Sequence, residues 1–193
     1  YTAAGGMEYD SGDFLAVMED ALKASDWDGF EARREASAKK GLLRGRGIAT
    51  YLEATGAPAR EMGRIRFEED GAVTMVTGSL DYGQGHAAPF AQVVGPKLGI
   101  PLDRFRLIQG DSDELIAGQG TGGSKTMISG GTIMLHTAEK VIENGLQIAA
   151  HVLEAAEVDI EFDTGQFTVA GTDRSVSLFE LVEHARKGLP CLL

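Results

Sequence analysis

The sequence has little cysteine, few basic residues and no long apolar run, and each shortage excludes a class of protein. A single cysteine, Cys191, cannot form an internal disulfide, as suits a reducing cytoplasm. The 18 basic residues are outnumbered by 29 acidic ones, and the net charge of -11 disfavours binding to nucleic acid or to an anionic membrane. No segment approaches the roughly 18 apolar residues of a membrane helix. We therefore expect a cytoplasmic protein.

Proline is scarce where glycine is abundant. Five prolines accompany 26 glycines in 193 residues, whereas glycine makes up roughly 7% of an average protein. An excess of glycine without proline does not indicate disorder. It predicts tight backbone geometry at particular places.

The two ends predict a piece of a longer chain. The sequence begins at Tyr1, and no signal peptide with a basic start and an apolar run follows. It ends on the apolar residues 189–193 (Leu-Pro-Cys-Leu-Leu), whereas natural termini usually lie in solvent and are polar. We expect further sequence beyond residue 193.

Two helices are predicted before the main domain. Apolar residues recur at helical spacing over 13–25, where Asp13 can serve as the N-cap. A second helix over 28–40 has few apolar residues and is expected to end at Gly41. We assign residues 1–42 to an N-terminal helical arm or linker, and residues 43–193 to one domain.

The domain is predicted to be α+β. Strands are expected over 48–53, 63–67, 72–77 and 105–108, with a hairpin turn at Asp70-Gly71 and a helix over 90–98. A long helix over about 124–154, roughly 45 Å at 1.5 Å per residue, contains Gly145, which suggests close packing there. A hairpin over 158–162 and 166–169 and a helix over 176–187, capped by Ser177, complete the order. This predicts a mixed sheet of strand-strand-helix-strand units packed against one long helix and preceded by the helical arm.

The first glycine-rich loop follows a predicted strand and reads Asp81-Tyr82-Gly83-Gln84-Gly85-His86. Glycines before a helix let the backbone approach a ligand closely and leave amide N–H groups free. Gln84 adds a side-chain amide that both donates and accepts. On local grounds alone, a tight strand-to-helix turn with a buried glutamine is the favoured interpretation of this segment.

The second glycine-rich loop, residues 118–124, precedes the long helix, where free amides and the helix dipole favour an anion. A phosphate-binding P-loop is excluded because Ser124 separates Gly123 from Lys125. The glycine spacing matches a dinucleotide fingerprint only formally, because an acidic turn at residues 111–114 precedes the loop instead of a strand. That acidic turn could bind a cation, but a solvated turn is the simpler interpretation.

No motif for a metal ligated by side chains is present. The four histidines are scattered, without the spacing of a zinc site or a partner cysteine pair. There is also no nucleophile elbow. Taken alone, the residues therefore predict no more than an α+β domain with one or two anion-binding loops.

An ordered series of segments is more specific than either loop. Residues 47–53 (Gly-Ile-Ala-Thr-Tyr-Leu-Glu), 81–86, Gln92 with 98–101, 110–113 and 118–125 resemble, in the same order, the molybdopterin-binding domain of molybdenum hydroxylase large subunits. This family includes xanthine dehydrogenase, aldehyde oxidase and carbon monoxide dehydrogenase. The opening Tyr9-Asp10-Ser11-Gly12-Asp13-Phe14 is similar to the carbon monoxide dehydrogenase type.

The resemblance implies a cofactor site. It assigns molybdenum–molybdopterin, in the cytosine dinucleotide form, with the metal held by the pterin dithiolene and by no side chain of this chain. Gln84 would hydrogen-bond an oxygen ligand of the metal. The other implied cofactor contacts are Gly83, Gly85, His86, Thr121, Gly122, Gly123 and Ser124.

The resemblance also implies what lies outside the chain. The catalytic glutamate and the substrate loop are expected beyond residue 193, so no catalytic residue is assigned here. Implied partners are the rest of the large subunit, iron-sulfur and FAD subunits and a small substrate, in an oligomeric enzyme. Family members often have threonine and arginine where Ala87, Ala88, Pro89 and Lys125 stand, which changes individual cofactor contacts.

Two other functions remain open at this point. The chain could be a free-standing module that binds a nucleotide or a phosphorylated metabolite with its glycine-rich loops. It could also be a scaffold whose glycines serve only packing. Sequence beyond residue 193 and the effect of replacing Gln84 distinguish these from a fragment of an oxidoreductase.

Overall fold

The computed structural model of the protein describes residues 1–3, 6–52, 56 and 60–188. By packing, the chain divides into two compact units, Tyr1–Leu52 and Glu53–Leu193. Each is described by itself below. The domain boundary that the sequence predicts after residue 42 stays a prediction. Residues just after it contact the first unit, where the Arg44 Nε donates to Ser37 Oγ at 2.9 Å.

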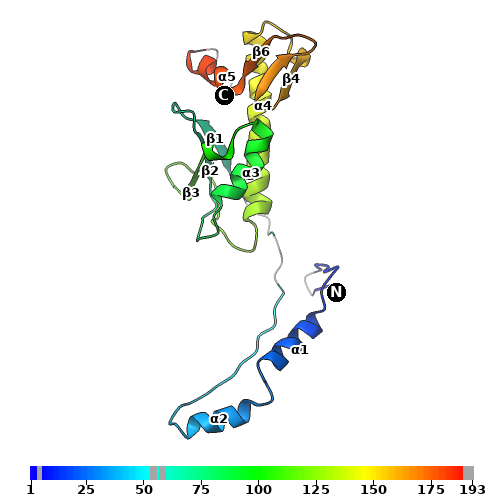
Figure 1. The fold of residues 1–193 in the computed structure, drawn as a ribbon, viewed down its shortest axis with the longest axis vertical. Coiled ribbons are helices and arrows are strands. Elements are labelled where there is room, and N and C mark those ends of the chain that lie inside the picture. The colour runs from blue at the N-terminus through cyan, green and yellow to red at the C-terminus, as the bar shows by residue number, and fades with distance from the viewer. Residues whose placement is uncertain (4–5, 53–55, 57–59, 189–193) are drawn as a thin grey trace. The chain divides into compact units, whose positions relative to one another are not determined.

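The first unit consists of helices α1 (Phe14–Ala24) and α2 (Phe30–Ala38) followed by an extended segment (Figure 1). The predicted N-cap is confirmed, since the Asp13 carboxylate accepts from the Ala16 N–H at 3.0 Å. The Arg46 guanidinium lies over the rings of Trp27 and Phe30, 4.3 and 4.5 Å from their centroids. These cation–π contacts tie the extended segment to the helices.

The strand predicted over residues 48–53 is wrong for the part that is described. Residues 48–52 form no helix or strand, and Glu53 lies outside the described residues. Ile48 and Tyr51 are 53% and 83% exposed. A β-rich sequence needs a partner strand for its backbone hydrogen bonds, and this segment has none among the described residues.

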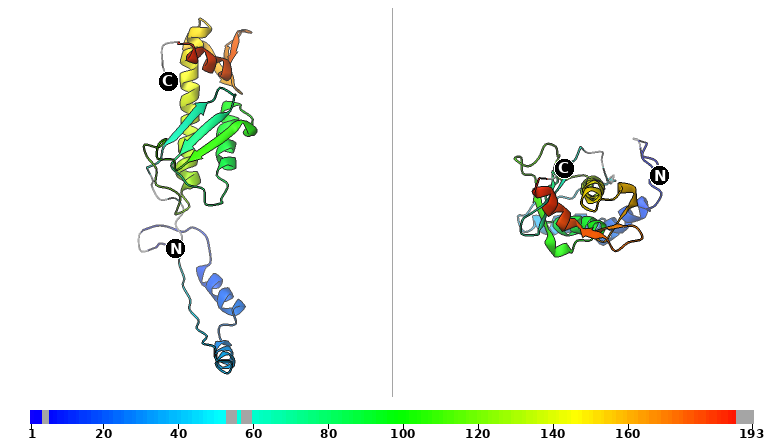
Figure 2. Two further views of the ribbon diagram at one scale, coloured as in Figure 1. Left: turned by 90° about the vertical axis from the view of Figure 1, so that its left-hand side faces the viewer. Right: turned by 90° about the horizontal axis from the view of Figure 1, so that it is seen from above.

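The second unit begins with a three-stranded mixed sheet in the order β1-β2-β3. Strand β1 (Gly63–Phe67) is antiparallel to β2 (Val73–Thr77), and β3 (Phe105–Gln109) is parallel to β2. Every residue of β2 is buried, as expected of a central strand covered on both faces. Helix α3 (Ala87–Leu98) connects β2 to β3, after which a short 3-10 turn, η1 (Leu102–Arg104), leads into β3. Helices α3 and α4 lie on the same face of this sheet (Figure 2).

The predicted long helix is present but begins differently. Residues Thr126–Gly131 (η2) form a π-helical turn, and the α-helix α4 spans Thr132–Val152. Its 21 residues correspond to roughly 32 Å, shorter than the predicted 45 Å. Met127, expected on the packed face, lies in this π turn and is 42% exposed. Among the described residues no helix is long and apolar enough to cross a membrane.

A second sheet, antiparallel and ordered β4-β5-β6, packs on the C-terminal part of α4. The predicted hairpin is confirmed as β4 (Ile160–Asp163) and β5 (Gln166–Val169), and the 3-10 turn η3 (Glu157–Asp159) precedes it. Strand β6 (Ser175–Ser177), which the sequence reasoning missed, leads directly into α5 (Leu178–Arg186). Ser177 caps α5 as predicted, in a capping box with Glu180. The strands therefore form two sheets, and the predicted α+β class is confirmed.

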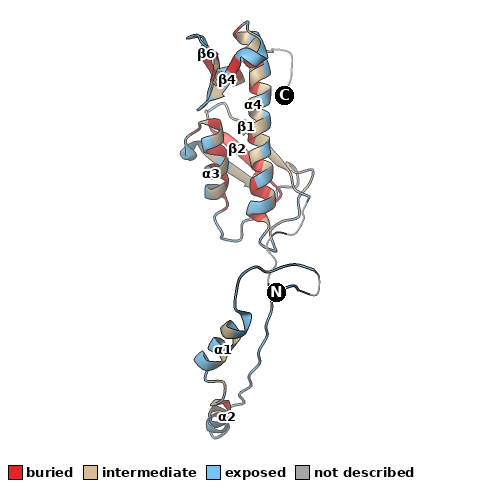
Figure 3. Cartoon of the chain, turned by 90° about the vertical axis from the view of Figure 1, so that its right-hand side faces the viewer, coloured by how far each residue is buried: buried red, intermediate tan, exposed pale blue. Residues whose placement is uncertain are grey.

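One hydrophobic core connects both sheets (Figure 3). Helix α4 contributes buried residues to both parts. Met134 and Ala138 in its first half and Ile148 and Ala149 in its second half all belong to this core, and the helix as a whole contacts β1, α3, β4, β5 and α5. The helix therefore fixes the two sheets relative to one another within this unit.

The packing of α4 against the second sheet can be tested by a substitution at Gly145. A Cβ at Gly145 would overlap the ring of Phe167, with Cε1 at 2.9 Å. Replacing glycine by alanine in a helix ordinarily stabilises it by about 1 kcal/mol, but overpacking costs about 1–3 kcal/mol. We expect Gly145→Ala to be neutral or destabilised by up to about 2 kcal/mol, as measured by urea unfolding. Gln147→Ala, at an exposed position of α4, is the control. A gain near 1 kcal/mol for Gly145→Ala would contradict the contact.

Candidate functional site

Two glycine-rich loops meet at one edge of the first sheet. Strands β2 and β3 are parallel and in register, with Thr77 opposite Gln109, so both carboxyl ends lie at the same edge. The β2–α3 loop (residues 78–86) leaves one strand, and the β3–η2 loop (residues 110–125) leaves the other. Each loop leads into a helical segment. The edge where parallel strands end is the usual place for a ligand in sheets of this kind.

The β2–α3 loop is organised around the Asp81 carboxylate. It accepts hydrogen bonds from the backbone N–H groups of Gly83 and His86, each at 2.7 Å. The expectation that the amides of this loop are free is therefore wrong for these two residues. An Asp two positions before a glycine commonly accepts such a bond, so the Asp81-Tyr82-Gly83 pattern was a signal that the sequence reasoning did not use.

These hydrogen bonds change the acidity of Asp81. Backbone N–H groups, first that of His86 and then those of Gly83, Gly85 and Gln84, lower the pKa of the Asp81 carboxyl, while desolvation opposes the shift. The Asp81 carboxylate thus occupies the backbone N–H donors that could otherwise bind a phosphate. An anionic ligand is disfavoured at this loop.

Gln84 is exposed, and its side chain folds back on its own loop. Its Oε1 accepts the Tyr82 N–H in a short hydrogen bond. The carbonyl end is thereby engaged, which leaves the NH₂ end as a donor. The backbone φ angles of Gly83 and Gly85, 109° and 74°, lie in the region that favours glycine.

His86 lies beneath the loop rather than on its surface. Its side chain is 5% exposed, and Nδ1 lies 3.0 Å from the Gln109 Nε2 at the end of β3. The imidazole ring also packs beside Phe90, with centroids 5.9 Å apart. His86 therefore links the β2–α3 loop to the neighbouring strand.

The β3–η2 loop is tied to the first by Thr121. The Leu80 N–H donates to Thr121 Oγ1 at 3.1 Å, and the Thr121 and Thr126 hydroxyls lie 2.9 Å apart. The hydroxyl of Thr121 is consequently used within the protein. Gly122, Gly123 and Ser124 follow it and are exposed.

The exposed backbone of both loops faces open space. A Cβ built at Gly83, Gly85, Gly122 or Gly123 would meet no atom within 4 Å outside its neighbours. The side chains of the protein therefore leave the backbone of both loops open to a ligand. Of the eight predicted site residues, seven lie on these two adjoining loops with their backbone or side chain partly or fully exposed, and His86 supports them from below.

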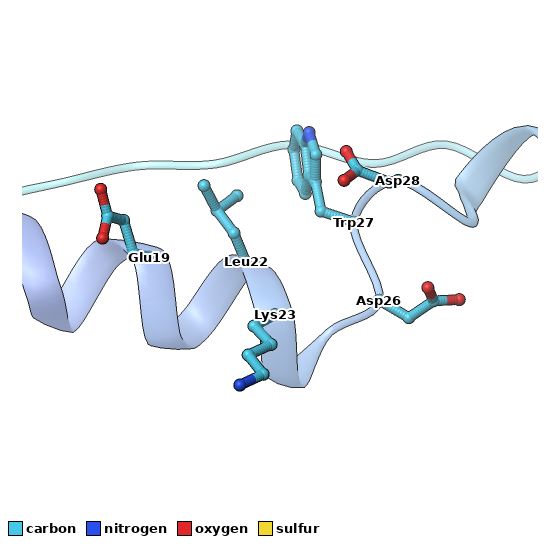
Figure 4. A pocket seen from close by; sticks show the side chains of 6 residues that line it. All are labelled: Glu19, Leu22, Lys23, Asp26, Trp27 and Asp28. Atoms are coloured by element: carbon cyan, nitrogen blue, oxygen red, sulfur yellow. The ribbon is translucent and has the colours of Figure 1, made fainter.

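Neither of two cavities elsewhere contains a predicted site residue. One, of about 380 Å³, belongs to the first unit (Figure 4). There Leu22 and Trp27 lie side by side between the carboxylates of Glu19 and Asp28. The other, of about 340 Å³, is an apolar groove between β1, α4 and α5 that includes Phe67. The predicted site is instead the open surface formed by the two loops.

Side-chain ligands for a metal ion are not gathered anywhere in residues 1–3, 6–52, 56 and 60–188, where no group of three or more His, Cys, Asp or Glu could hold one. The acidic turn of the β3–η2 loop is used internally. Glu114 forms ion pairs with Arg64 at 2.8 Å and Arg66 at 3.1 Å, and Asp111 accepts from the Asp113 N–H at 2.9 Å.

Comparison with known proteins decides the family. The sequence profile of the molybdopterin cofactor-binding domain matches residues 20–190. This chain belongs to the molybdopterin cofactor-binding domain family. It is 32% identical over 187 residues to the carbon monoxide dehydrogenase large chain of Hydrogenophaga pseudoflava, covering 90% of this chain and 23% of the relative. It is 28% identical to the nicotine 6-hydroxylase large subunit of Paenarthrobacter nicotinovorans, covering 91% and 23%.

Solved structures agree with the sequence comparison. The Cu,Mo-CO dehydrogenase in its carbon monoxide reduced state matches with a TM-score of 0.69 and 30% identity, covering 100% of this chain and 26% of that chain. Quinoline 2-oxidoreductase from Pseudomonas putida 86 matches with a TM-score of 0.61 and 26% identity, covering 96% and 25%. The chain thus spans about a quarter of the length of the relatives it matches.

The loops fit a molybdopterin cofactor. A flat pterin can lie against exposed glycine backbone, and four glycines of the two loops have no side-chain or backbone atom over them. Gln84 offers an amide donor, and Ser124 offers an exposed hydroxyl. The resemblance described above implies a metal that is bound by the cofactor itself, in which case no cluster of ligating side chains is expected at this site.

The hydrogen bonds to the Asp81 carboxylate should make the stability of the folded protein depend on pH. The pKa of Asp81 is lower in the folded protein than its ordinary value of about 3.9. Its contribution to stability is therefore complete above the unfolded-state pKa and is lost as the pH falls through the lower folded-state pKa. We expect Asp81→Asn to be less stable than wild type at neutral pH, with the difference shrinking in acid. Urea unfolding from neutral to acid pH tests this.

Asp103 provides the control, since it is an exposed aspartate outside both loops. The difference in stability between wild type and Asp103→Asn should not shrink in this way as the pH falls. A difference between wild type and Asp81→Asn that stays constant over the whole pH range would contradict the arrangement around Asp81.

Proposed function

We propose that this chain holds part of the molybdenum–molybdopterin cofactor in the large subunit of a molybdenum-dependent hydroxylase or dehydrogenase. One observation carries the proposal. In a chain of the molybdopterin cofactor-binding domain family, two glycine-rich loops meet at the carboxyl ends of parallel strands with their backbone open. Bound there, the cofactor would supply the redox chemistry by which the enzyme oxidises a small substrate with oxygen derived from water.

Gln84 is the proposed contact to an oxygen ligand of the metal. Its Oε1 is engaged by the Tyr82 N–H, so the side chain is oriented with its NH₂ group as the donor. Gly83 and Gly85 let the loop backbone approach the cofactor. His86 is proposed to support the loop from below, because its side chain is buried.

The β3–η2 loop is the proposed partner of the pterin and its phosphates. The Thr121 hydroxyl is used by Leu80 and Thr126, so the contacts are assigned to the backbone of Gly122 and Gly123 and to the Ser124 hydroxyl. A phosphate belongs here rather than on the first loop, whose donors already face the Asp81 carboxylate. A cytosine dinucleotide form of the cofactor would place its charged part at this loop.

The alternative of a free-standing nucleotide- or phosphate-binding module is less well supported. Such a ligand would meet the charge of Asp81 at the first loop. At the second loop, Lys125 directly follows Ser124, without the order of a P-loop. Both features are compatible with a cofactor that has a neutral part and an anionic part.

The catalytic and electron-transfer parts are proposed to lie elsewhere. The relatives are named as large chains or as a subunit of a complex, including the 6-hydroxypseudooxynicotine dehydrogenase complex subunit gamma of Paenarthrobacter nicotinovorans. We therefore propose iron-sulfur and FAD partner subunits in an oligomeric, cytoplasmic enzyme. The catalytic glutamate and the residues that choose between an aldehyde, an N-heterocycle and carbon monoxide are assigned to the rest of the large subunit.

Replacing Gln84 tests its assigned contact. In the full-length enzyme we expect Gln84→Ala to lower the turnover per molybdenum about tenfold, as expected for the loss of one hydrogen bond worth about 1.4 kcal/mol. Molybdenum content and kcat are measured on the same preparation. Gln92→Ala, at an exposed position of α3, is the matched control. Unchanged molybdenum content and turnover in Gln84→Ala would count against the proposed contact.

A second test fills the open surface. Gly122 has no atom within 4 Å of a built Cβ and no unusual φ, so Gly122→Leu should leave the fold intact. Its side chain would occupy the space assigned to the cofactor, and we expect the molybdenum content per large subunit to fall severalfold. Gly47→Leu, where a Cβ likewise meets nothing within 4 Å, is the control. Equal molybdenum content in the two variants would mean that the cofactor does not lie on this loop.

A further inference from the structure

We propose that Glu61, which precedes β1, is a positioning residue that sets the spacing between the two glycine-rich loops. The inference rests on the proposed function, since it concerns the loops assigned to the cofactor. Glu61 touches neither the exposed loop glycines nor the space above them. It acts through the bend by which the chain leaves β2.

The Glu61 carboxylate accepts hydrogen bonds from Gly78 and Ser79 of this bend and from Met62. Its Oε1 accepts the N–H of Gly78 at 2.9 Å and that of Met62 at 3.1 Å. Its Oε2 accepts the Ser79 hydroxyl at 3.2 Å, and Ser79 is only 1% exposed. The first two residues after β2 are thus fixed by a side chain from a different segment. A charged acceptor makes stronger hydrogen bonds than a neutral one.

The fixed bend is also where the two loops touch. A Cβ at Gly118 would lie 2.5 Å from the Cα of Gly78, so the two backbones are in direct contact. The Gly120 N–H donates to the Gly78 carbonyl at 3.2 Å. The peptide groups on either side of Gly78 therefore connect Glu61 on one side to the β3–η2 loop on the other.

The neighbouring residue strengthens this connection. The Ile116 N–H of the β3–η2 loop donates to the Met62 sulfur at 3.2 Å. Glu61 and Met62 are consecutive, so one short segment before β1 holds both loops. A shift of the Glu61 carboxylate would change the position of Gly78, and with it the distance between Gln84 and Gly122.

Three variants of Glu61 in the full-length enzyme separate positioning from stability. Glu61→Ala removes all three acceptor contacts. Glu61→Gln keeps an amide oxygen for the Gly78 N–H, while its NH₂ group can donate to the Ser79 hydroxyl. Glu61→Asp keeps the charge but is one methylene too short to reach Gly78.

Glu68→Ala is the matched structural control. Glu68 also accepts two side-chain hydrogen bonds on the same sheet, from Thr74 Oγ1 at 2.6 Å and Arg66 Nε at 2.9 Å. It lies at the opposite end of the β1–β2 hairpin from the loops. Its loss should weaken the sheet without moving the loops.

The measurements are Tm, molybdenum content, kcat and KM per molybdenum, and the electron paramagnetic resonance signal of Mo(V). For Glu61→Ala we expect kcat per molybdenum to fall roughly 10- to 100-fold, the range for misplacing a reacting group by about 1 Å. KM should change little, and the Mo(V) signal should be altered. Glu61→Gln should retain most of the turnover, and Glu68→Ala should lower Tm alone.

The outcomes distinguish this proposal from the proposed function. If Glu61→Ala matches Glu68→Ala in turnover per molybdenum and in the Mo(V) signal while Gln84→Ala is impaired, positioning by Glu61 is wrong and the cofactor assignment stands. If Gln84→Ala and Gly122→Leu are also unchanged, the cofactor assignment itself fails. Should Glu61→Ala not fold, the turnover per molybdenum of Glu61→Gln must exceed that of Glu61→Asp. Equal or reversed values overturn the proposal.

Discussion

Strands β2 and β3 run parallel and pair in register from Val73 opposite Phe105 to Thr77 opposite Gln109. The carboxyl ends of both strands are therefore neighbours, and the loops that leave them must cross the same edge. Because each loop continues into a helical segment on the same face of the sheet, the loops cannot separate without unpairing the strands or moving a buried helix. The position of the candidate site thus follows from the topology of three strands, and the loop residues determine only what the site can bind.

The charge at this edge is unevenly divided, which has a chemical consequence. The β2–α3 loop places the Asp81 carboxylate against its own amides, whereas the exposed amides and hydroxyl of the β3–η2 loop follow Thr121. A ligand with uniform negative charge would be repelled on one side. A ligand with a neutral ring system and a separate anionic group suits both sides, and a molybdopterin cofactor has this composition.

Interactions between residues close in sequence were largely predictable. The Asp13 cap, the Ser177 cap and the β4–β5 hairpin each depend on neighbours within a few residues, and the structure contains all three. The failures have a common cause in longer-range packing. Residues 48–52, the described part of the strand expected at 48–53, have no partner strand among the described residues. The π-helical start of the long helix packs at Gly130 against Phe90 and Ser79, which are distant in sequence. The Glu61–Gly78 contact spans 17 residues, so no local pattern could have revealed it. The two loops were predicted as the site because their glycines stand in an ordered series, which is a property of the whole chain.

The π-helical turn connects the site to the core. Gly130 lies against the ring of Phe90 in α3, where an added Cβ would come within 3.1 Å of Cζ. Thr126, at the other end of the same turn, is buried and shares a hydrogen bond with Thr121. A π turn has one more residue per hydrogen-bonded ring than an α-helix, so it allows both contacts to form at once. The β3–η2 loop is therefore anchored at its end by a helix that is packed against α3, and at Gly118 and Gly120 by the bend that Glu61 holds. Thr121 is also held, by Leu80 and Thr126. Only residues 122–125 therefore remain to adapt to a ligand, so contacts at the loop should depend more on the spacing of its anchors than on the identity of its exposed side chains.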